Sequence, residues 1–300
     1  MAPKTQGILA ILTAVLVWAG WMITTRMLAF SHLNPYDIAA LRFAIAGAAL
    51  LPVVLKRGWG IGPGLRGSLS LTFFLGPVYV IVVATGMHFA PASHTAALVN
   101  GFMVLTSMVL GAFWLKEPFS PQKKIGSWIL LSGVAAIVYA KLGGEGNIGH
   151  ALFALGGCLW AMYGLNLKRW KANPWHATAV MSVFSALIYL PLYFLFLRSA
   201  DSGASWGELV FHGTYQGLLT AVLATYLYGR AVVLLGASTA SAFVPLVLVI
   251  TLLLAIPLLG EWPAPVELLG VSLVFAGMLV IAWGARASAP AKAKRGSRSS

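Results

Sequence analysis

Charged residues are scarce in this chain. They make up 9% of its 300 residues, whereas a soluble domain carries about 25%. Hydrophobic residues account for 59%, and the mean hydropathy is +0.87. This composition excludes an ordinary water-soluble globule and argues equally against a disordered chain.

Acidic residues are the scarcer of the two charge types. Seven Asp and Glu stand against 20 Lys and Arg, which gives a formal net charge of +13. In a polar protein such an excess would suggest a nucleic-acid partner. Here the basic residues lie in short clusters between long apolar runs, which is typical of membrane proteins. We therefore expect contact with membrane lipids and no nucleic-acid partner.

Groups for catalysis or metal binding are also few. The single cysteine, Cys158, excludes an internal disulfide and a cysteine-based metal site. The six His and seven acidic residues lie in loops or towards span ends, and no His pair has metal-ligand spacing. We therefore expect no metal, no cofactor and no enzymatic activity. The absence of a mid-membrane carboxylate also disfavours a proton-driven cation exporter.

Long apolar runs dominate what is present, and a spanning helix needs about 20 such residues. Ten stretches qualify, so the predicted fold is an all-α integral membrane protein with ten transmembrane helices. The predicted spans are 7–28, 35–55, 67–87, 92–115, 122–140, 149–167, 175–197, 209–234, 237–259 and 265–285.

The distribution of Lys and Arg predicts the orientation, because cytoplasmic loops are enriched in these residues. With the N-terminus inside, 16 of the 20 lie on the inner side and three on the outer side, while Arg42 lies within a span. Both termini are therefore predicted to be cytoplasmic, in a multi-pass protein of the inner (plasma) membrane.

The chain also repeats itself at a shift of about 142 to 144 residues, estimated from three ordered blocks of matching residues. The blocks pair Gly7, Trp18 and Arg26 with Gly149, Trp160 and Lys168; 34–36 with 173–175; and Glu117, Pro121, Gly126 and Gly133 with Glu261, Pro265, Gly270 and Gly277. These matches divide the chain into a cytoplasmic head (1–6), two five-helix repeats (7–142 and 149–285) and a basic cytoplasmic tail (286–300).

Five spans in each half put the second half into the membrane in the opposite direction. This inverted repeat is typical of secondary transporters, whose substrate site lies near the midplane between the halves. We expect the two fused halves to suffice as a monomer.

Several short motifs lie along the chain. They are Trp18-Ala19, Trp160-Ala161, Leu41-Arg42-Phe43, Ala237-Ser238 leading to Val244-Pro245, and Gly260-Glu261. These motifs resemble EamA repeats, and two such repeats in ten spans are similar to members of the drug/metabolite transporter superfamily. The resemblance covers roughly 7–285 and is closest to the YddG-type amino-acid exporters, which implies export of amino acids, including aromatic ones.

The same resemblance implies that certain spans line a cavity. Tyr79, Tyr226, Tyr228 and Phe243 lie in those spans, each either as packing or as a ligand for substrate. The first half departs from the pattern because Asn100 stands roughly where the second half has Pro245.

Mid-span aromatic residues are the main candidates for substrate binding. Trp18 and Trp21 share a helix face, and the repeat places Trp160 and Tyr163 opposite them. The predicted result is a quartet of rings that holds an ammonium group or stacks on an aromatic side chain. The alternative is simple packing between helices.

Two amides lie at membrane depth, Asn100 and Asn166. Each either binds a substrate carboxylate or amine, or forms an interhelical hydrogen bond of about 0.6 kcal/mol.

Arg42 and four other residues are predicted to have structural or gating roles. Arg42 is expected to pair with Asp37, Glu261 or helix-end carbonyls as a structural anchor, with a functional role as the alternative. Glu117 and Glu261 are expected to organise turns, and Pro77 and Pro245 are candidate hinges because proline interrupts a helix.

The sequence thus predicts a secondary transporter that exports small metabolites by alternating access, as a facilitator or exchanger for neutral or zwitterionic solutes. The alternatives are a lipophilic-cation efflux carrier and, in another class, a membrane receptor or scaffold that transports nothing.

Overall fold

The computed structural model describes residues 2–116, 120–140, 146–198 and 203–287. All of its regular elements in these ranges are helical, as predicted. They are α1 (Pro3–Met27), η1 (Leu28–Phe30), α2 (Pro35–Arg57), α3 (Leu65–Leu75), α4 (Pro77–Phe89), α5 (Ala92–Trp114), α6 (Pro121–Tyr139), α7 (Gly146–Arg169), α8 (Pro174–Leu192), η2 (Tyr193–Leu197), α9 (Trp206–Gly213), η3 (Thr214–Ala224), α10 (Thr225–Leu235), α11 (Ala237–Ser241), α12 (Leu246–Leu259) and α13 (Pro265–Ala287).

Each predicted span coincides with one of these helices or with a consecutive set of them. Within the described ranges, nine segments are long and apolar enough to cross a membrane. The remaining predicted span is α6, which has 19 residues. It carries Lys123 and Lys124 in its first turn, and this pair lowers its hydropathy.

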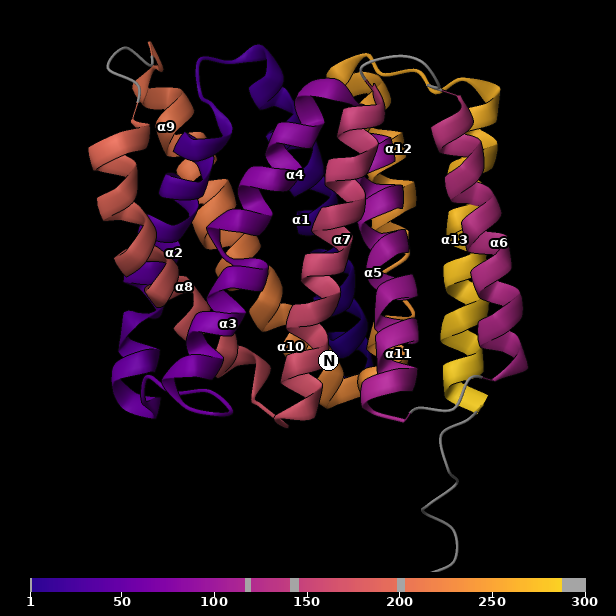
Figure 1. The fold of residues 1–300 in the computed structure, drawn as a ribbon, viewed down its shortest axis with the longest axis horizontal. Coiled ribbons are helices and arrows are strands. Elements are labelled where there is room, and N and C mark those ends of the chain that lie inside the picture. Colours follow the sequence, from indigo (N-terminus) through magenta and orange to yellow (C-terminus); the bar gives the residue numbers. More distant parts are fainter. Residues whose placement is uncertain (1, 117–119, 141–145, 199–202, 288–300) are drawn as a thin grey trace, which may run out of the picture.

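The helices stand side by side in a bundle, and the N-terminal and C-terminal helices begin and end at the same end of it (Figure 1). α1 begins and α13 ends at that end. The described termini therefore lie on one side, as an even number of crossings requires. Which side faces the cytoplasm stays a prediction.

Equivalent capping residues begin the second span of each half. The Asn34 side chain accepts hydrogen bonds from the backbone N–H groups of Tyr36 and Asp37, and the Asn173 side chain accepts one from His176. A proline follows each Asn at the first helical position, where its missing N–H costs nothing. An Asn cap contributes about 1 kcal/mol, so the repeated Asn-Pro pair starts both helices at a defined residue.

Four glycines let α6 and α13, the last helices of the two halves, cross in close contact (Figure 1). A Cβ atom at Gly126 would lie 2.9 Å from the carbonyl oxygen of Gly277, and one at Gly133 would lie 2.6 Å from that of Gly270. The reverse contacts are just as short, at 2.7 Å for Gly277 and 2.9 Å for Gly270. Lipid provides no hydrophobic drive for helix association, so close backbone packing stabilises this pair.

The same contacts show how the halves are related. Gly126 and Gly270 are equivalent in the repeat, as are Gly133 and Gly277. The earlier glycine of one helix meets the later glycine of the other, so α6 and α13 are antiparallel and related by a local two-fold axis. An axis of this kind lies in the membrane plane of an inverted repeat.

Irregular helix geometry occurs at different places in the two halves. In the first half, the third span breaks at Gly76 and Pro77 between α3 and α4. In the second half, the third span contains the π-helical η3, and the fourth breaks between α11 and α12, where Pro245 precedes α12. Pro77 and Pro245 therefore mark helix breaks, whereas their role as hinges stays a prediction. The fourth span of the first half, α5, continues through Asn100 without a break.

The glycine crossing predicts a specific stability effect. Gly133→Ala places a methyl group against the backbone of α13, 2.6 Å from the Gly270 oxygen and 2.7 Å from the Val274 nitrogen. Overpacking of this kind costs about 1 to 3 kcal/mol, so we expect a lower melting temperature in detergent.

Gly164→Ala is the matched control, because a Cβ atom there meets nothing within 4 Å. We expect this variant to melt at or above the wild-type temperature, since alanine favours helix over glycine. Equal behaviour of the two variants would contradict the tight crossing.

Candidate functional site

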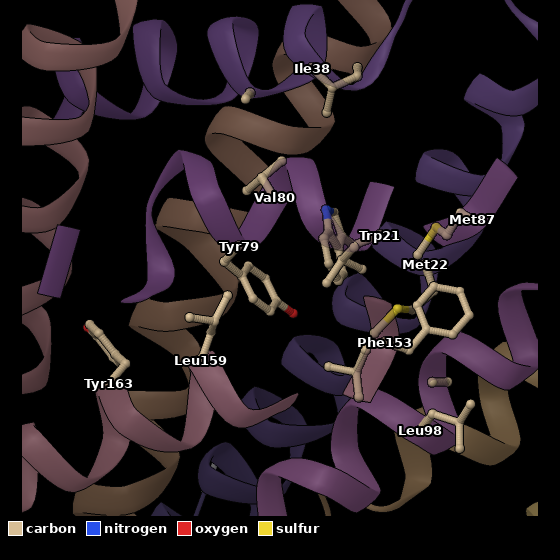
Figure 2. Packing of buried hydrophobic residues seen from close by; sticks show 14 of the residues in the cluster. Trp21, Met22, Ile38, Tyr79, Val80, Met87, Leu98, Phe153, Leu159 and Tyr163 are labelled. Carbon is tan, nitrogen blue, oxygen red and sulfur yellow. The ribbon is translucent and has the colours of Figure 1, made fainter. Parts of the chain in front are cut away.

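Three aromatic rings from both halves form a continuous series inside the bundle. The Trp21 ring of α1 stacks on the Tyr79 ring of α4 with 6.1 Å between ring centres, and Tyr79 meets Trp160 of α7 edge to face at 5.8 Å. Trp21 and Tyr79 are buried, while Trp160 keeps part of its surface exposed. Figure 2 shows Trp21 beside Tyr79. Tyr79 therefore joins an aromatic residue of the first half to one of the second.

The helix break at Gly76 positions the middle ring. Pro77 starts α4, and Tyr79 follows in the first turn. A Cβ atom at Gly76 would lie 2.1 Å from the Thr72 oxygen and 2.7 Å from the Ser185 hydroxyl, so only glycine fits this bend.

A glutamine that sequence reasoning missed binds the Trp21 indole. The Trp21 Nε1–H donates to Gln216 Oε1 at 2.6 Å, and the Gln216 amide nitrogen donates to the Thr25 hydroxyl at 2.9 Å. Gln216 is fully buried and lies in the π-helical η3. The available signal was a lone amide inside an apolar span, which needs a partner. This network links α1 to the second half.

Arg42 lies against the same rings, and its predicted pairing is wrong. Asp37 instead accepts from the Tyr193 hydroxyl at 2.6 Å, and Glu261 pairs with Arg26 at 2.6 Å. Among the described residues, Nε and Nη1 of Arg42 are buried without a hydrogen-bond partner. The guanidinium carbon lies 5.6 Å from the centre of the Trp21 ring.

The predicted quartet of rings is not a single cluster. Trp18 contacts Tyr228 of α10 at 5.5 Å, and it packs with Phe243 in a hydrophobic cluster separate from that of Trp21. In the described part of the chain, Trp18 has no ring contact with Trp21 or Trp160. Trp18 contacts Tyr228 instead of the other rings of the predicted quartet because α10, α11 and α12 cover this turn of α1.

Tyr163 also lies apart from the rings of the series (Figure 2), packed against Thr178 of α8. The repeat pairs it with Trp21, and both lie in the same hydrophobic cluster, but among the described residues Tyr163 has no ring contact with the series. A separate cavity of about 260 Å³ is lined by residues that include Pro245 and Tyr228, the ring partner of Trp18.

Comparison with known proteins decides the family. The sequence matches the profile of the EamA-like transporter family twice, over residues 5–139 and 147–283. The chain belongs to the EamA-like transporter family. It is therefore a multi-pass membrane transporter with two EamA repeats, and the family implies small-molecule substrates.

Similar transporters cover most of this chain. A probable amino-acid metabolite efflux pump of Salmonella typhimurium is 29% identical over 94% of this chain and 96% of its own length. A probable terminal-alkyne amino-acid exporter of Streptantibioticus cattleyicolor is 24% identical over 92% and 93%. The uncharacterized transporter YvbV of Bacillus subtilis is 29% identical, but the match spans only 56% of this chain and 55% of that one. A solved crystal structure with a TM-score of 0.61 and 20% identity covers 97% of this chain and 100% of its own, and supports the fold.

Other predicted site residues of the EamA transporter lie outside the ring series. The Asn100 amide donates to the Ala96 carbonyl of its own helix at 2.7 Å. Asn166 is buried one turn before the end of α7. Tyr226 is 50% exposed and meets Trp175 edge to face at 5.7 Å. Glu117 lies outside the described residues.

Glu261 of the transporter organises the ends of several helices. Its Oε1 accepts from Arg26 Nε at 2.6 Å, and its Oε2 accepts from the Ala92 backbone at 2.9 Å. Arg26 also donates to the Met87 carbonyl. The carboxylate thus ties the end of α1 to the connection between α4 and α5.

A second polar cluster brings together two histidines that are far apart in the sequence. His94 and His150 lie in the first turns of α5 and α7, near span ends as expected, but their Nδ1 and Nε2 atoms are 3.0 Å apart and both residues are buried. Glu267 of α13 lies 3.4 Å from His94. Within the described ranges no group of three such side chains is arranged to hold a metal ion. The cluster therefore connects three helices.

The Arg26–Glu261 pair supports a double-mutant test. Arg26→Ala and Glu261→Ala each leave the partner charge unpaired in a largely buried place, so each lowers the melting temperature. Because the two side chains are in contact, we expect a coupling free energy of about 1 to 3 kcal/mol in the double mutant.

The Arg230→Ala and Glu261→Ala cycle is the control, because Arg230 is exposed on α10 and the structure shows no ion pair between the two. Additive effects in the Arg26 cycle would contradict a stabilising pair.

Proposed function

We propose that this EamA transporter exports amino acids, including aromatic ones, across the inner membrane by alternating access. The substrate binds between the two halves, beside the rings of Trp21, Tyr79 and Trp160. Both termini are cytoplasmic, and the monomer works as a facilitator or exchanger. The halves that move are the repeats 7–142 and 149–285.

The ring series is the observation that carries this proposal. α1 and α4 belong to the first half and α7 to the second, so a ligand on these rings contacts both. Aromatic faces attract an ammonium group by about 0.5 to 2 kcal/mol per contact, and they stack on aromatic side chains. Trp160 keeps part of its surface exposed, and this is where a ligand would reach the series.

The similar proteins support the class of substrate. Two of them are described as a probable amino-acid metabolite efflux pump and a probable terminal-alkyne amino-acid exporter. Both are similar along more than nine-tenths of this chain. An amino acid is a zwitterion. A site where no described carboxylate pairs with Arg42 suits a zwitterion better than it suits a lipophilic cation.

Transport by proteoliposomes tests the proposal. Vesicles loaded with an unlabelled amino acid are given the labelled compound outside, without an imposed ion gradient, and counterflow is measured over a panel of amino acids. We expect transient accumulation for aromatic amino acids. Trp160→Ala removes one ring contact and raises the half-saturating concentration about 2- to 30-fold.

Trp128→Ala is the matched control, because that side chain is 73% exposed on the outer surface of α6. We expect wild-type counterflow from it. No flux for any amino acid with correctly folded protein would overturn the proposal, and equal losses in both variants would remove the ring series from the site.

A further inference from the structure

The guanidinium of Arg42 lies inside a membrane helix and has no ion-pair partner among the described residues. Arg42 follows Pro35, the first residue of α2, by seven positions, which places it about 10 Å into the helix. Its side chain forms no hydrogen bond or ion pair with the described residues, and Nε and Nη1 are shielded from solvent. A charged group at such depth normally pairs or marks a substrate path.

Protein carboxylates do not neutralise this charge within the described ranges, since each of the four described acidic residues has another partner. The partners are the Tyr193 hydroxyl for Asp37, the Ser205 hydroxyl and backbone N–H for Glu208, Arg26 for Glu261 and His94 for Glu267. Arg26 provides a direct contrast, because it meets a carboxylate and a carbonyl near the end of its own helix. The compensating anion for Arg42 therefore has to come from elsewhere.

A second unused donor lies beside Arg42. Among the described residues the buried Tyr79 hydroxyl has no hydrogen-bond partner, and it is close enough to Arg42 for the two groups to interact electrostatically. The Trp21 ring closes another side at 5.6 Å from the guanidinium carbon. A cation above a ring face gains attraction, but its N–H donors still lack acceptors. Two neighbouring donors without acceptors fit one acceptor-only group, which is a carboxylate.

Arg42 also lies where the two halves meet. η3 packs on α2 at this point, since a Cβ atom at Gly217 would lie 3.3 Å from the Arg42 carbonyl oxygen and 2.7 Å from the Ile45 side chain. Gln216, the neighbour of Gly217, binds Trp21. An anion at Arg42 is therefore in reach of both halves, as a substrate that drives their exchange must be.

We propose that Arg42 and the Tyr79 hydroxyl bind the α-carboxylate of the transported amino acid, while its side chain lies along the rings towards Trp160. This inference rests on the proposed export of amino acids. It excludes amines without a carboxylate as good substrates, because they would place a second positive charge beside Arg42 without compensation.

Binding of a matched ligand series tests the carboxylate directly. Phenylalanine, phenylalanine amide and 2-phenylethylamine share the ring and the amine, but only the first has the carboxylate. Isothermal titration calorimetry is carried out with the full-length protein in nanodiscs. Hydrogen bonds to a charged group contribute enough that we expect phenylalanine to bind about 10- to 150-fold more tightly than either analogue.

Substitutions of Arg42 and Tyr79 then test whether these two donors cause the preference for phenylalanine over its amide. In Arg42→Gln we expect phenylalanine to bind no better than its amide, and in Tyr79→Phe we expect the preference to fall but persist. Arg230→Gln removes the same charge from an exposed site on α10 and keeps the wild-type preference. Arg42→Gln without ligand should melt no lower than wild type, because it removes an uncompensated buried charge.

The possible failures are distinguishable. If wild-type protein binds and transports phenylalanine and its amide equally well, the carboxylate site is wrong while amino-acid export stands. If Arg42→Gln retains the preference, or unfolds in the absence of ligand, Arg42 is a structural residue and the inference is overturned. If no amino acid binds or moves, the proposed function fails and this inference fails with it.

Discussion

Backbone polar groups in a bilayer have no water to bind, so they must be satisfied within helices or by neighbouring protein. This requirement limits where the chain departs from regular α-helix. The departures include the break at Gly76–Pro77, the π-helical η2 and η3, and the break before Pro245. Two of them lie beside the candidate site, because Tyr79 follows the first break and Gln216 lies in η3, and both residues contact Trp21. The irregular backbone at these two places therefore borders the ring series.

Arg26, near the C-terminal end of α1, and Arg42, in the N-terminal half of α2, have very different surroundings. Arg26 lies at a helix end, with Glu261 and two backbone groups of neighbouring segments organised around it. Arg42 lies deeper, and in the described part of the chain it has aromatic rings beside it but no hydrogen-bond or ion-pair partner. Leaving a guanidinium in the bilayer centre costs about 2.5 to 3.5 kcal/mol or more. If Arg42 were purely structural, we would expect it to have a carboxylate and a carbonyl partner, as Arg26 does.

Much of the fold was predictable because it depends on one-dimensional patterns. Apolar length located the ten spans, the Asn34-Pro35 and Asn173-Pro174 pairs began the second span of each half, and spacing alone matched the four glycines that meet in the α6–α13 crossing. The site was less predictable because ring contacts depend on helix rotation. Trp18 and Trp21 share a face of α1, yet different helices cover their two turns, so one ring meets Tyr228 and the other Tyr79. Likewise, nothing in the spacing of His94 and His150 indicated that α5 and α7 would bring their imidazoles together.

The glycine crossing of α6 and α13 is isologous, because equivalent patches of the two helices contact each other in antiparallel orientation. Gly126 faces Gly277 as Gly270 faces Gly133. A surface with this property is complementary to its own copy before any fusion joins the two. The contact is therefore compatible with an ancestor of five helices that paired with itself in opposite orientations. After duplication the rest of each half was free to diverge, as the aromatic and polar residues did. The four positions in the crossing, in contrast, all had to remain glycine.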